Sequence, residues 1–524
     1  MTKKIFMILL AIALALSVGL IGCTTPAQQE EEEEEEEEPY GGTLRIILGG
    51  ETSSMFPPEQ ISPEDHSAAI PALEMLWYLD KEGMYQPWLA ESWEEDPDNL
   101  EISIYLKEGI KFQDGSDFNA EAVKWNIEQL KDSEYTGPSF WAISSVDAVD
   151  EYTVRVNLIA WDNLLQSSLG FWGMVSKEAY EENGIDYMRE NPVGTGPFKL
   201  VSWQRDLQKV YEKWDGYWQE GKPYLDKIEL NIIADPMVQE ASFLAGENDI
   251  LLNVNPTAAY YMKDNPNVEI VTSTQNGFTY GLIPDSANPD SPFSKLEVRQ
   301  AMSYAINREA IADAIFRGYG EVTYQYNGPE NWSYNPYIVG YPYDPDKARD
   351  LLEDAGYGDG FSTVIWYKSE QLHQDLYTAV QADLAAVGID AELQPLVPDT
   401  YDFMYYVDGW IGGVFGAMTS SYNDIQDLSI WFWDPDSCVP AFAFSAIHPD
   451  DLVDIGRQAV SATDFESKKS LCQEMQYLLF DKYCLQTTVV LLPIMTAKSS
   501  KLRDEYTGTV WVEPHTYADA WIAE

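Results

Sequence analysis

The chain has 524 residues and a mass of 59.3 kDa, so at least two domains are expected. Its 32 Lys and Arg residues against 87 Asp and Glu residues give a formal net charge of −55. That balance excludes nucleic acid as a partner, because phosphate groups must be neutralised by cationic side chains, and it disfavours binding to a bare anionic membrane surface.

The N-terminus has the pattern of an exported lipoprotein. Two lysines precede the apolar run Ile5–Leu20, which is typical of a secretory signal; a retained membrane anchor is the alternative. The run ends at Leu20-Ile21-Gly22-Cys23, which resembles the bacterial lipobox and implies cleavage before Cys23 and lipid attachment to its thiol. We therefore expect a signal peptide over residues 1–22 and a lipid anchor on Cys23.

Residues 23–40 contain the nine consecutive glutamates Glu30–Glu38. Repulsion between these charges predicts an extended, disordered tether between the membrane and a folded body. No later apolar run approaches the roughly 18 residues of a membrane-spanning helix. The sequence therefore predicts an extracytoplasmic body held at the membrane by Cys23 alone.

Past Gly41, short strand patterns alternate with amphipathic helix patterns, which predicts an α/β fold with open sheets. In chain order we expect a strand at Leu44–Leu48, a strand at Glu101–Leu106, a helix at Ala120–Leu130 capped by Asn119, a helix at Val298–Phe316, a strand at Val364–Tyr367, a helix at Leu376–Val387, a helix at Lys468–Leu479 with Asp464 near its cap, and a strand at Val489–Leu492.

Three cysteines follow Cys23: Cys438, Cys472 and Cys484. An exported protein can form disulfides, but an odd number of thiols allows at most one internal bridge. Cys472 and Cys484 would lie about 18 Å apart on a continuous helix, too far for a bond. Cys438 could then pair with either one. Because no CxxC spacing is present, we expect no metal site.

Four sequence blocks follow one another in the body: Leu89–Trp93 with Ile104–Val123, Val193–Phe198, Val298–Arg308, and Tyr343–Tyr357. In this order, behind a lipobox, they resemble the solute-binding lipoproteins of ABC importers, in the peptide/nickel class (extracellular solute-binding protein family 5). The resemblance covers nearly the whole mature chain. The matched residues are mostly turns and packed helix faces, so they identify the family without forming its site.

This resemblance implies a two-lobed periplasmic-binding-protein-like α/β fold of the large class, with the ligand cleft between the lobes. The implied boundaries are 41–276 plus 497–524 for lobe I, about 77–190 for an extra subdomain within it, and 277–496 for lobe II. Thr274–Gly281 and the segment around Pro493 would be the two crossings between the lobes.

The implied function is that of an extracytoplasmic substrate-binding lipoprotein. It would capture a small solute, short peptides first, by hinge closure and deliver it to an ABC permease and its ATPase subunits. An oligosaccharide-binding member of the same family is the alternative, and a secreted hydrolase is the alternative outside it. No HExxH, GxSxG, Walker A, EF-hand or GxGxxG motif is present, so we expect no catalysis, cofactor or metal. We also expect a monomer.

Candidate ligand-binding residues lie in aromatic or glycine-containing segments, because binding residues concentrate in loops on a rigid scaffold. They are Trp172, Tyr280, Tyr406, Asp408, Gly409, Trp410, Ile411 and Gly413. The surplus of aromatic residues that contains them, 17 Trp, 33 Tyr and 19 Phe, suits either peptide side chains or sugar rings.

The Gly409-Trp410 pair gives the sharpest site prediction. In peptide-binding relatives a Gly-Trp pair is followed, three residues after the Trp, by an aspartate that pairs with the peptide's α-ammonium. Alignment on Trp410 puts Gly413 at that position, and alignment on the upstream Tyr401-Asp402 pair puts Ile411 there.

Neither replacement can carry a charge, and a buried ammonium without a partner is costly. Either a nearby carboxylate, Asp408 or Asp424, must substitute, or the ligand lacks that amine. The second case favours an uncharged ligand such as an oligosaccharide.

Overall fold

The computed structural model describes residues 40–80, 84–420, 425–503 and 516–523. The predicted signal peptide, the tether, Cys23 and Asp424 lie outside the described residues. Within the described ranges, no helix combines the length and the apolar character needed to cross a membrane.

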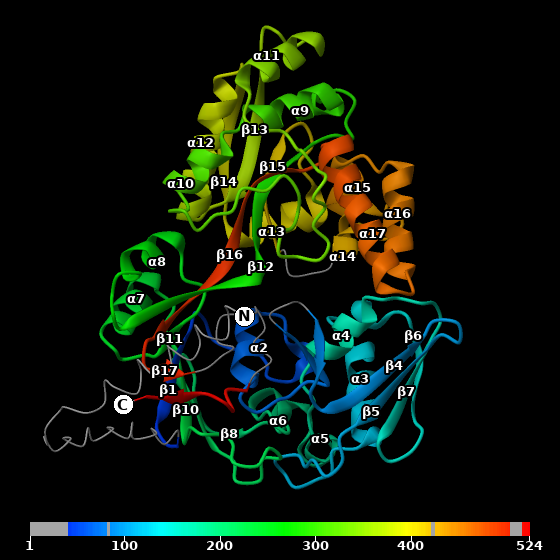
Figure 1. The fold of residues 1–524 in the computed structure, drawn as a ribbon, viewed down its shortest axis with the longest axis vertical. Coiled ribbons are helices and arrows are strands. Elements are labelled where there is room, and N and C mark those ends of the chain that lie inside the picture. The colour runs from blue at the N-terminus through cyan, green and yellow to red at the C-terminus, as the bar shows by residue number, and fades with distance from the viewer. Residues whose placement is uncertain (1–39, 81–83, 421–424, 504–515, 524) are drawn as a thin grey trace, which may run out of the picture. The chain divides into compact units, whose positions relative to one another are not determined.

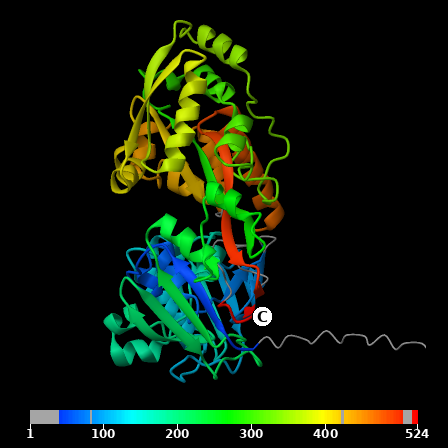
Figure 2. The same ribbon diagram turned by 90° about the vertical axis from the view of Figure 1, so that its left-hand side faces the viewer.

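One mixed sheet of ten strands passes through both lobes, in the order β14-β13-β15-β12-β16-β11-β1-β10-β9-β8. The first lobe carries β1, β8 to β11, and the second carries β13 to β15; β12 and β16 run between them (Figures 1 and 2). The bounds are β1 (Thr43–Leu48), β8 (Phe198–Gln204), β9 (Gln208–Lys213), β10 (Lys227–Ile232), β11 (Ile250–Leu251), β12 (Val268–Pro284), β13 (Phe361–Lys368), β14 (Ile389–Leu396), β15 (Val414–Ser420) and β16 (Thr487–Ser499).

The pairing of β12 with β16 is interrupted where the two strands cross from one lobe to the other. The register shifts between Thr272 and Gly277, and Gly277 pairs with Pro493, which has no N–H to donate. A Cβ atom on Gly277 would lie 2.5 Å from the Leu492 carbonyl oxygen, so the close approach requires glycine. The predicted crossings fall in this segment, while the lobe boundaries stay a prediction.

A second sheet, β4-β5-β7-β6, forms a subdomain with helix α3. Its elements are β4 (Ala90–Asp96), β5 (Glu101–Leu106), β6 (Ile143–Ala148), β7 (Thr153–Leu158) and α3 (Ala120–Asp132). The predicted strand at β5 is confirmed, with alternate residues buried. The helix prediction is also confirmed, because the Asn119 side chain accepts a hydrogen bond from the Ala122 N–H and so caps α3.

The prediction of one continuous helix over Val298–Phe316 is wrong. The segment forms two helices, α9 (Leu296–Ala305) and α10 (Arg308–Ala314). Asn307 interrupts it: its side chain accepts a hydrogen bond from the Ala310 N–H, and its own N–H donates to Asp383 Oδ2 at 2.9 Å. The N-cap contact and the hydrogen bond to Asp383 therefore end the first helix and start the second, although the apolar stripe is continuous.

The other predicted elements are confirmed with shifted ends. Helix α12 spans Gln371–Ala385, and α17 (Phe465–Gln476) continues as the π-helical segment η6 (Tyr477–Lys482). The Asp464 side chain caps α17 by accepting from the Ser467 N–H. Among the described residues, no disulfide joins Cys438, Cys472 and Cys484 to one another.

The remaining elements complete the two lobes. They are η1 (Pro57–Glu59), α2 (Pro63–Ala69), β2 (Trp77–Leu79), β3 (Tyr85–Pro87), η2 (Gly137–Phe140), α4 (Leu165–Phe171), α5 (Lys177–Asn183), α6 (Ile185–Glu190), α7 (Pro236–Leu244), α8 (Pro256–Met262), η3 (Pro292–Ser294), α11 (Pro345–Asp354), α13 (Pro398–Phe403), η4 (Met404–Asp408), α14 (Ile425–Leu428), η5 (Ser429–Trp433), α15 (Pro440–Ser445), α16 (Asp450–Ser461), β17 (Leu502–Arg503) and β18 (Trp521–Ile522).

Glu74 ties the subdomain to the first lobe. Its Oε1 accepts hydrogen bonds from Trp88 Nε1 at 2.9 Å and the Tyr217 hydroxyl at 2.8 Å. Its Oε2 accepts from the Thr195 hydroxyl at 2.7 Å and Trp218 Nε1 at 2.9 Å. Burial raises the pKa of Glu74, and these hydrogen bonds oppose that shift by favouring the charged form. The carboxylate therefore joins segments that are distant in sequence.

The Glu74→Gln variant tests this connection. An amide offers one acceptor oxygen and turns an NH2 group toward two donors, so we expect the free energy of unfolding to fall by about 2–4 kcal/mol. Urea unfolding measures it. The control is Glu94→Gln, at an exposed carboxylate that accepts from the Tyr105 hydroxyl. Equal stability of the two variants would contradict the role given to Glu74.

Candidate functional site

The strand pairing determines which strand ends of the two lobes face each other. In the first lobe β10 and β11 run parallel to β1, and β11 runs antiparallel to β16. Because β12 is also antiparallel to β16, the strands β1, β10 and β11 point the same way as β12, toward the second lobe. There β15 is antiparallel to β12, and β13 is parallel to both β15 and β14, so these three point back toward the first lobe.

The carboxyl ends of both sets of parallel strands therefore face the segment where β12 and β16 cross. Ligands of open α/β sheets bind outside the carboxyl ends of the strands. The candidate site is thus made by the described loops that follow β1, β10 and β11 on one side and β13 and β14 on the other.

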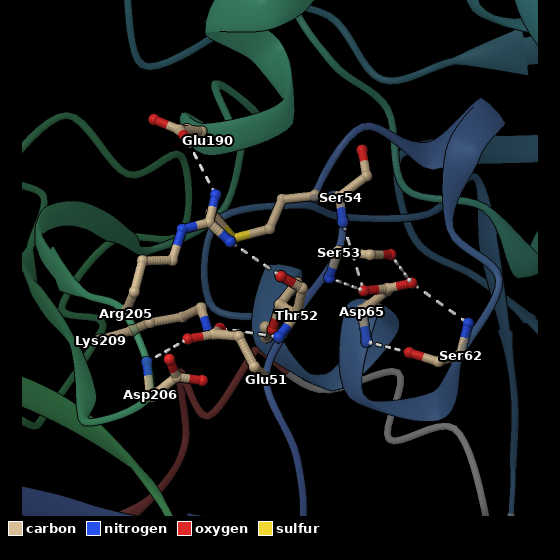
Figure 3. Close-up of polar contacts among 12 residues, drawn as sticks. Glu51, Thr52, Ser53, Ser54, Ser62, Asp65, Glu190, Arg205, Asp206 and Lys209 are labelled. Atoms are coloured by element: carbon tan, nitrogen blue, oxygen red, sulfur yellow. Dashed lines mark hydrogen bonds and ion pairs between the residues drawn. The ribbon is translucent and has the colours of Figure 1, made fainter.

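The loop after β1 is held in one conformation by Asp65 of α2 (Figure 3). The carboxylate accepts from the backbone N–H of Ser53 at 2.6 Å and from its hydroxyl at 2.8 Å. It also accepts from the backbone N–H groups of Ser54, Ile61 and Ser62. Asp65 is fully buried, so these hydrogen bonds are shielded from water and fix one side of the loop.

The hairpin of β8 and β9 supports the same loop from its other side. Lys209 Nζ, which is inaccessible to solvent, lies 2.9 Å from Glu51 Oε1, and Arg205 donates to the Thr52 carbonyl oxygen at 3.0 Å (Figure 3). Burial lowers the pKa of Lys209, and the carboxylate opposes that shift. Burial would raise the pKa of Glu51, but hydrogen bonds from Lys209 and from two backbone N–H groups outweigh it, so the pKa is lowered.

Glu51 and Lys209 are paired with each other, and Asp65 and Arg205 occupy the Ser53 hydroxyl and several backbone groups of the loop. The Thr52 hydroxyl is buried and has no hydrogen-bond partner among the described residues. A loop fixed before binding loses little conformational freedom when a ligand arrives, which favours affinity.

Trp172 is the predicted site residue that lies near this loop. It follows α4, with its ring centroid 4.9 Å from that of Phe171 and 6.3 Å from that of His66. His66 is the residue after Asp65 in α2 and stacks on Phe171 at 4.8 Å. Burial lowers the pKa of His66 to about 4. The pair Phe171 and Trp172 therefore packs against the helix that holds the β1 loop.

Tyr280 lies in β12 between Met418 of β15 and Val490 of β16. Its side chain is 4% exposed and packs beside Phe316 and His373, at centroid distances of 5.5 and 5.3 Å. Tyr280 is close to the crossing in sequence, but its ring is in the core of the second lobe.

The segment Gly409–Gly413 lies at the other end of β15. Val414, the first residue of β15, pairs with Pro284 at the far end of β12, whereas Ser420 pairs with Phe278 near the crossing. The structure therefore does not bring this segment together with the facing carboxyl ends.

The glycines of this segment have local structural reasons. Gly409 has a φ of 80°, and a Cβ atom there would lie 2.6 Å from the Ser445 hydroxyl oxygen. A Cβ atom on Gly413 would lie 2.4 Å from the Trp366 ring. Trp410 is 1% exposed, with centroids 5.2 Å from Phe415 and 5.0 Å from Phe442.

Tyr406, Asp408 and Ile411 are exposed on the surface beside this segment. A role in ligand binding stays a prediction for all the candidate residues. The sequence reasoning missed Glu51, Thr52 and Asp65, although the Gly49-Gly50 pair directly after a predicted strand was a signal of a functional loop.

Residues 84–432 match the family described as bacterial extracellular solute-binding proteins, family 5 Middle. The chain belongs to this family. Together with the fold, this makes it a two-lobed substrate-binding protein of an ABC transporter, and proteins of the family are extracytoplasmic. The relatives are solute-binding proteins of transport systems rather than enzymes.

Similar proteins include the glutathione-binding protein GsiB of Escherichia coli O1:K1, 34% identical over 361 residues, which cover 66% of this chain and 68% of GsiB. The substrate-binding protein CtaP of Listeria monocytogenes has a TM-score of 0.82 at 20% identity, covering 93% of this chain and 100% of CtaP. DppA of Helicobacter pylori, in complex with the peptide STSA, has a TM-score of 0.76 at 24% identity, covering 93% and 99%.

The burial of Trp410 generates a prediction about stability. Trp410→Ala removes a large side chain from the core, so we expect the free energy of unfolding to fall by about 3–5 kcal/mol. Ile411→Ala is the control, because Ile411 is 60% exposed and its truncation should change stability by about 0.5 kcal/mol or less. Denaturant unfolding compares them. A Trp410→Ala protein as stable as wild type that no longer binds solute would instead make Trp410 a ligand contact.

Proposed function

We propose that this protein is a lipid-anchored receptor that captures short peptides between its two lobes and hands them, chemically unchanged, to its ABC permease. The observation that carries the proposal is the opposition of the strand carboxyl ends of the two lobes across the interrupted pairing of β12 with β16. A solute that touches both sets of loops makes all its contacts only when the lobes are closed. Binding therefore shifts the population toward the closed form.

The proposal also includes attachment of the protein to the membrane. The lipobox-like segment ending at Cys23 and the acidic run Glu30–Glu38 support a lipid anchor and a spacer. Such an acidic spacer would let the body reach the permease without leaving the membrane surface. We further propose that the protein acts as a monomer and needs no metal or cofactor.

A peptide is favoured over an oligosaccharide for two reasons. GsiB is named for glutathione, a small peptide, and similar solved structures hold the peptide STSA and, in AppA of Bacillus subtilis, a nonapeptide. The aromatic segments that favoured sugar rings are largely structural, because Tyr405, Trp410 and Trp433 are buried together in one core cluster.

The β1 loop also suits a peptide. The Thr52 hydroxyl, which has no partner among the described residues, can hydrogen-bond an extended main chain, and Glu51 of the loop is already paired with Lys209. Such a site recognises the peptide backbone, which all short peptides share.

A thermal-shift and calorimetry screen tests the substrate class. The probes are di- to pentapeptides and glutathione, cello- and xylo-oligosaccharides, and nickel with histidine. We expect peptides to raise the melting temperature by a few degrees, because ligand at 100 times Kd stabilises the folded state by about 2.7 kcal/mol. The bound peptide, recovered and weighed by mass spectrometry, should be unchanged. Stabilisation by sugars alone would replace the peptide assignment, and cleavage of the peptide would make the protein a hydrolase.

A pair of isosteric variants locates the site within the same screen. Thr52→Val removes a buried hydroxyl in the β1 loop and should weaken peptide affinity about three- to tenfold. Thr363→Val is a matched control, because the Thr363 hydroxyl is also buried without a partner among the described residues, but near the amino end of β13. Equal affinities of the two variants would argue against the β1 loop as the binding surface.

A further inference from the structure

The loop between β7 and α4 contacts a helix that lies about 300 residues later in the chain. Asn163 donates its backbone N–H to the Val460 carbonyl oxygen at 3.0 Å. Its side-chain Nδ2 donates to the carbonyl oxygens of Ala459 at 2.7 Å and Ala462 at 3.1 Å. Trp161 Nε1 donates to the same Ala462 oxygen at 3.1 Å.

Ala459 and Val460 lie in the last turn of α16, which ends at Ser461, and Ala462 is the capping residue that follows it. The carbonyl groups in the last turn of a helix lack partners within the helix and must be satisfied by other donors. The last turn of α16 carries no basic residue. Donors from the loop therefore supply the hydrogen bonds that water would otherwise provide.

The two partners belong to different lobes. The loop follows the subdomain sheet, which Glu74 joins to the first lobe through its contacts with Trp88 and Tyr217. Helix α16 packs in the core cluster that contains Phe415 of β15, a strand of the second lobe. The contact can therefore exist only when the lobes are close together.

Charge supports the same contact. Burial raises the pKa of Asp162 and of Glu95 on the subdomain side, and the positive charge of Lys468 in α17, the helix after α16, opposes that shift by attracting their charged forms. Asp162 is 3% exposed, so this attraction is weakly screened by solvent. The charge of Lys468 therefore favours the approach of α17 to the subdomain beside the hydrogen-bonded helix end.

We propose that residues Trp161–Asn163 form a latch that caps the carboxyl end of α16, holds a share of the unliganded protein closed, and thereby sets the affinity for solute without touching it. The proposal rests on closure of the lobes around solute, as in the proposed function. The apparent Kd for a solute depends on the fraction of unliganded protein that is already closed. A contact that stabilises the closed form therefore changes Kd even when it lies far from the solute.

Two variants and a matched control test the latch. Asn163→Ala removes both side-chain hydrogen bonds to the end of α16. Trp161→Phe keeps an aromatic ring but removes the indole N–H donor. Asn157→Ala is the control, because the Asn157 amide donates to Ser145 and Asp147 within the subdomain sheet and makes no hydrogen bond to α16 among the described residues. The measurements are the radius of gyration of each unliganded protein by small-angle X-ray scattering and Kd for the peptide that best stabilises the wild type.

We expect Asn163→Ala to enlarge the unliganded radius of gyration and to weaken peptide binding about tenfold, Trp161→Phe to do both to a smaller extent, and Asn157→Ala to do neither. With saturating peptide all four proteins should have the same radius, which a merely misfolded variant would not reach. Unliganded radii of both latch variants equal to that of the wild type would overturn the latch. Because that measurement needs no ligand, it stands apart from a failure of the peptide assignment.

Discussion

The pairing of β12 with β16 is the constraint on which the rest of the structure depends. Two long antiparallel strands serve both lobes, so the directions of all the parallel strands are set relative to them. The interruption at Gly277 and Pro493 weakens the ladder at the point where bending is needed. One pair of strands therefore both orients the two binding edges and provides the place where they can move.

The charge of the chain and the charge of the candidate site differ. The chain carries a formal net charge of −55, yet behind the β1 loop Glu51 is paired with Lys209 and Glu190 with Arg205. Buried and paired charges fix loop conformation, while exposed carboxylates keep the body soluble. A receptor for short peptides needs a fixed loop more than a charged one, since its ligands share a backbone and differ in charge.

Much of the fold could be predicted from the sequence, because it depends on local signals. The capped helix α3 and the alternating strand β5 follow from residues within a few positions of one another. The break at Asn307 could not, since it depends on Asp383, which is distant in sequence. The structure also explains the family block Val193–Phe198. A Cβ atom on Gly194 would lie 2.2 Å from the Ala72 carbonyl oxygen, so this block marks a close backbone contact.

The site was harder to predict because it is assembled from distant segments. Glu51 and Lys209 are separated by 158 positions, and no spacing in the sequence reveals their contact. Trp410 stands in a glycine-rich segment that is typical of a binding loop, but Phe415 and Phe442 bury it. Motif position alone could not separate a ligand contact from a core residue there.

The most direct test of this account is a crystal structure of the protein with a bound peptide identified by the screen. The account predicts a peptide between the Gly49–Ser54 loop and the segments that follow β13 and β14, in contact with both lobes. A peptide bound instead beside Trp410 and Gly413, at the amino end of β15, or on one lobe alone, would contradict it.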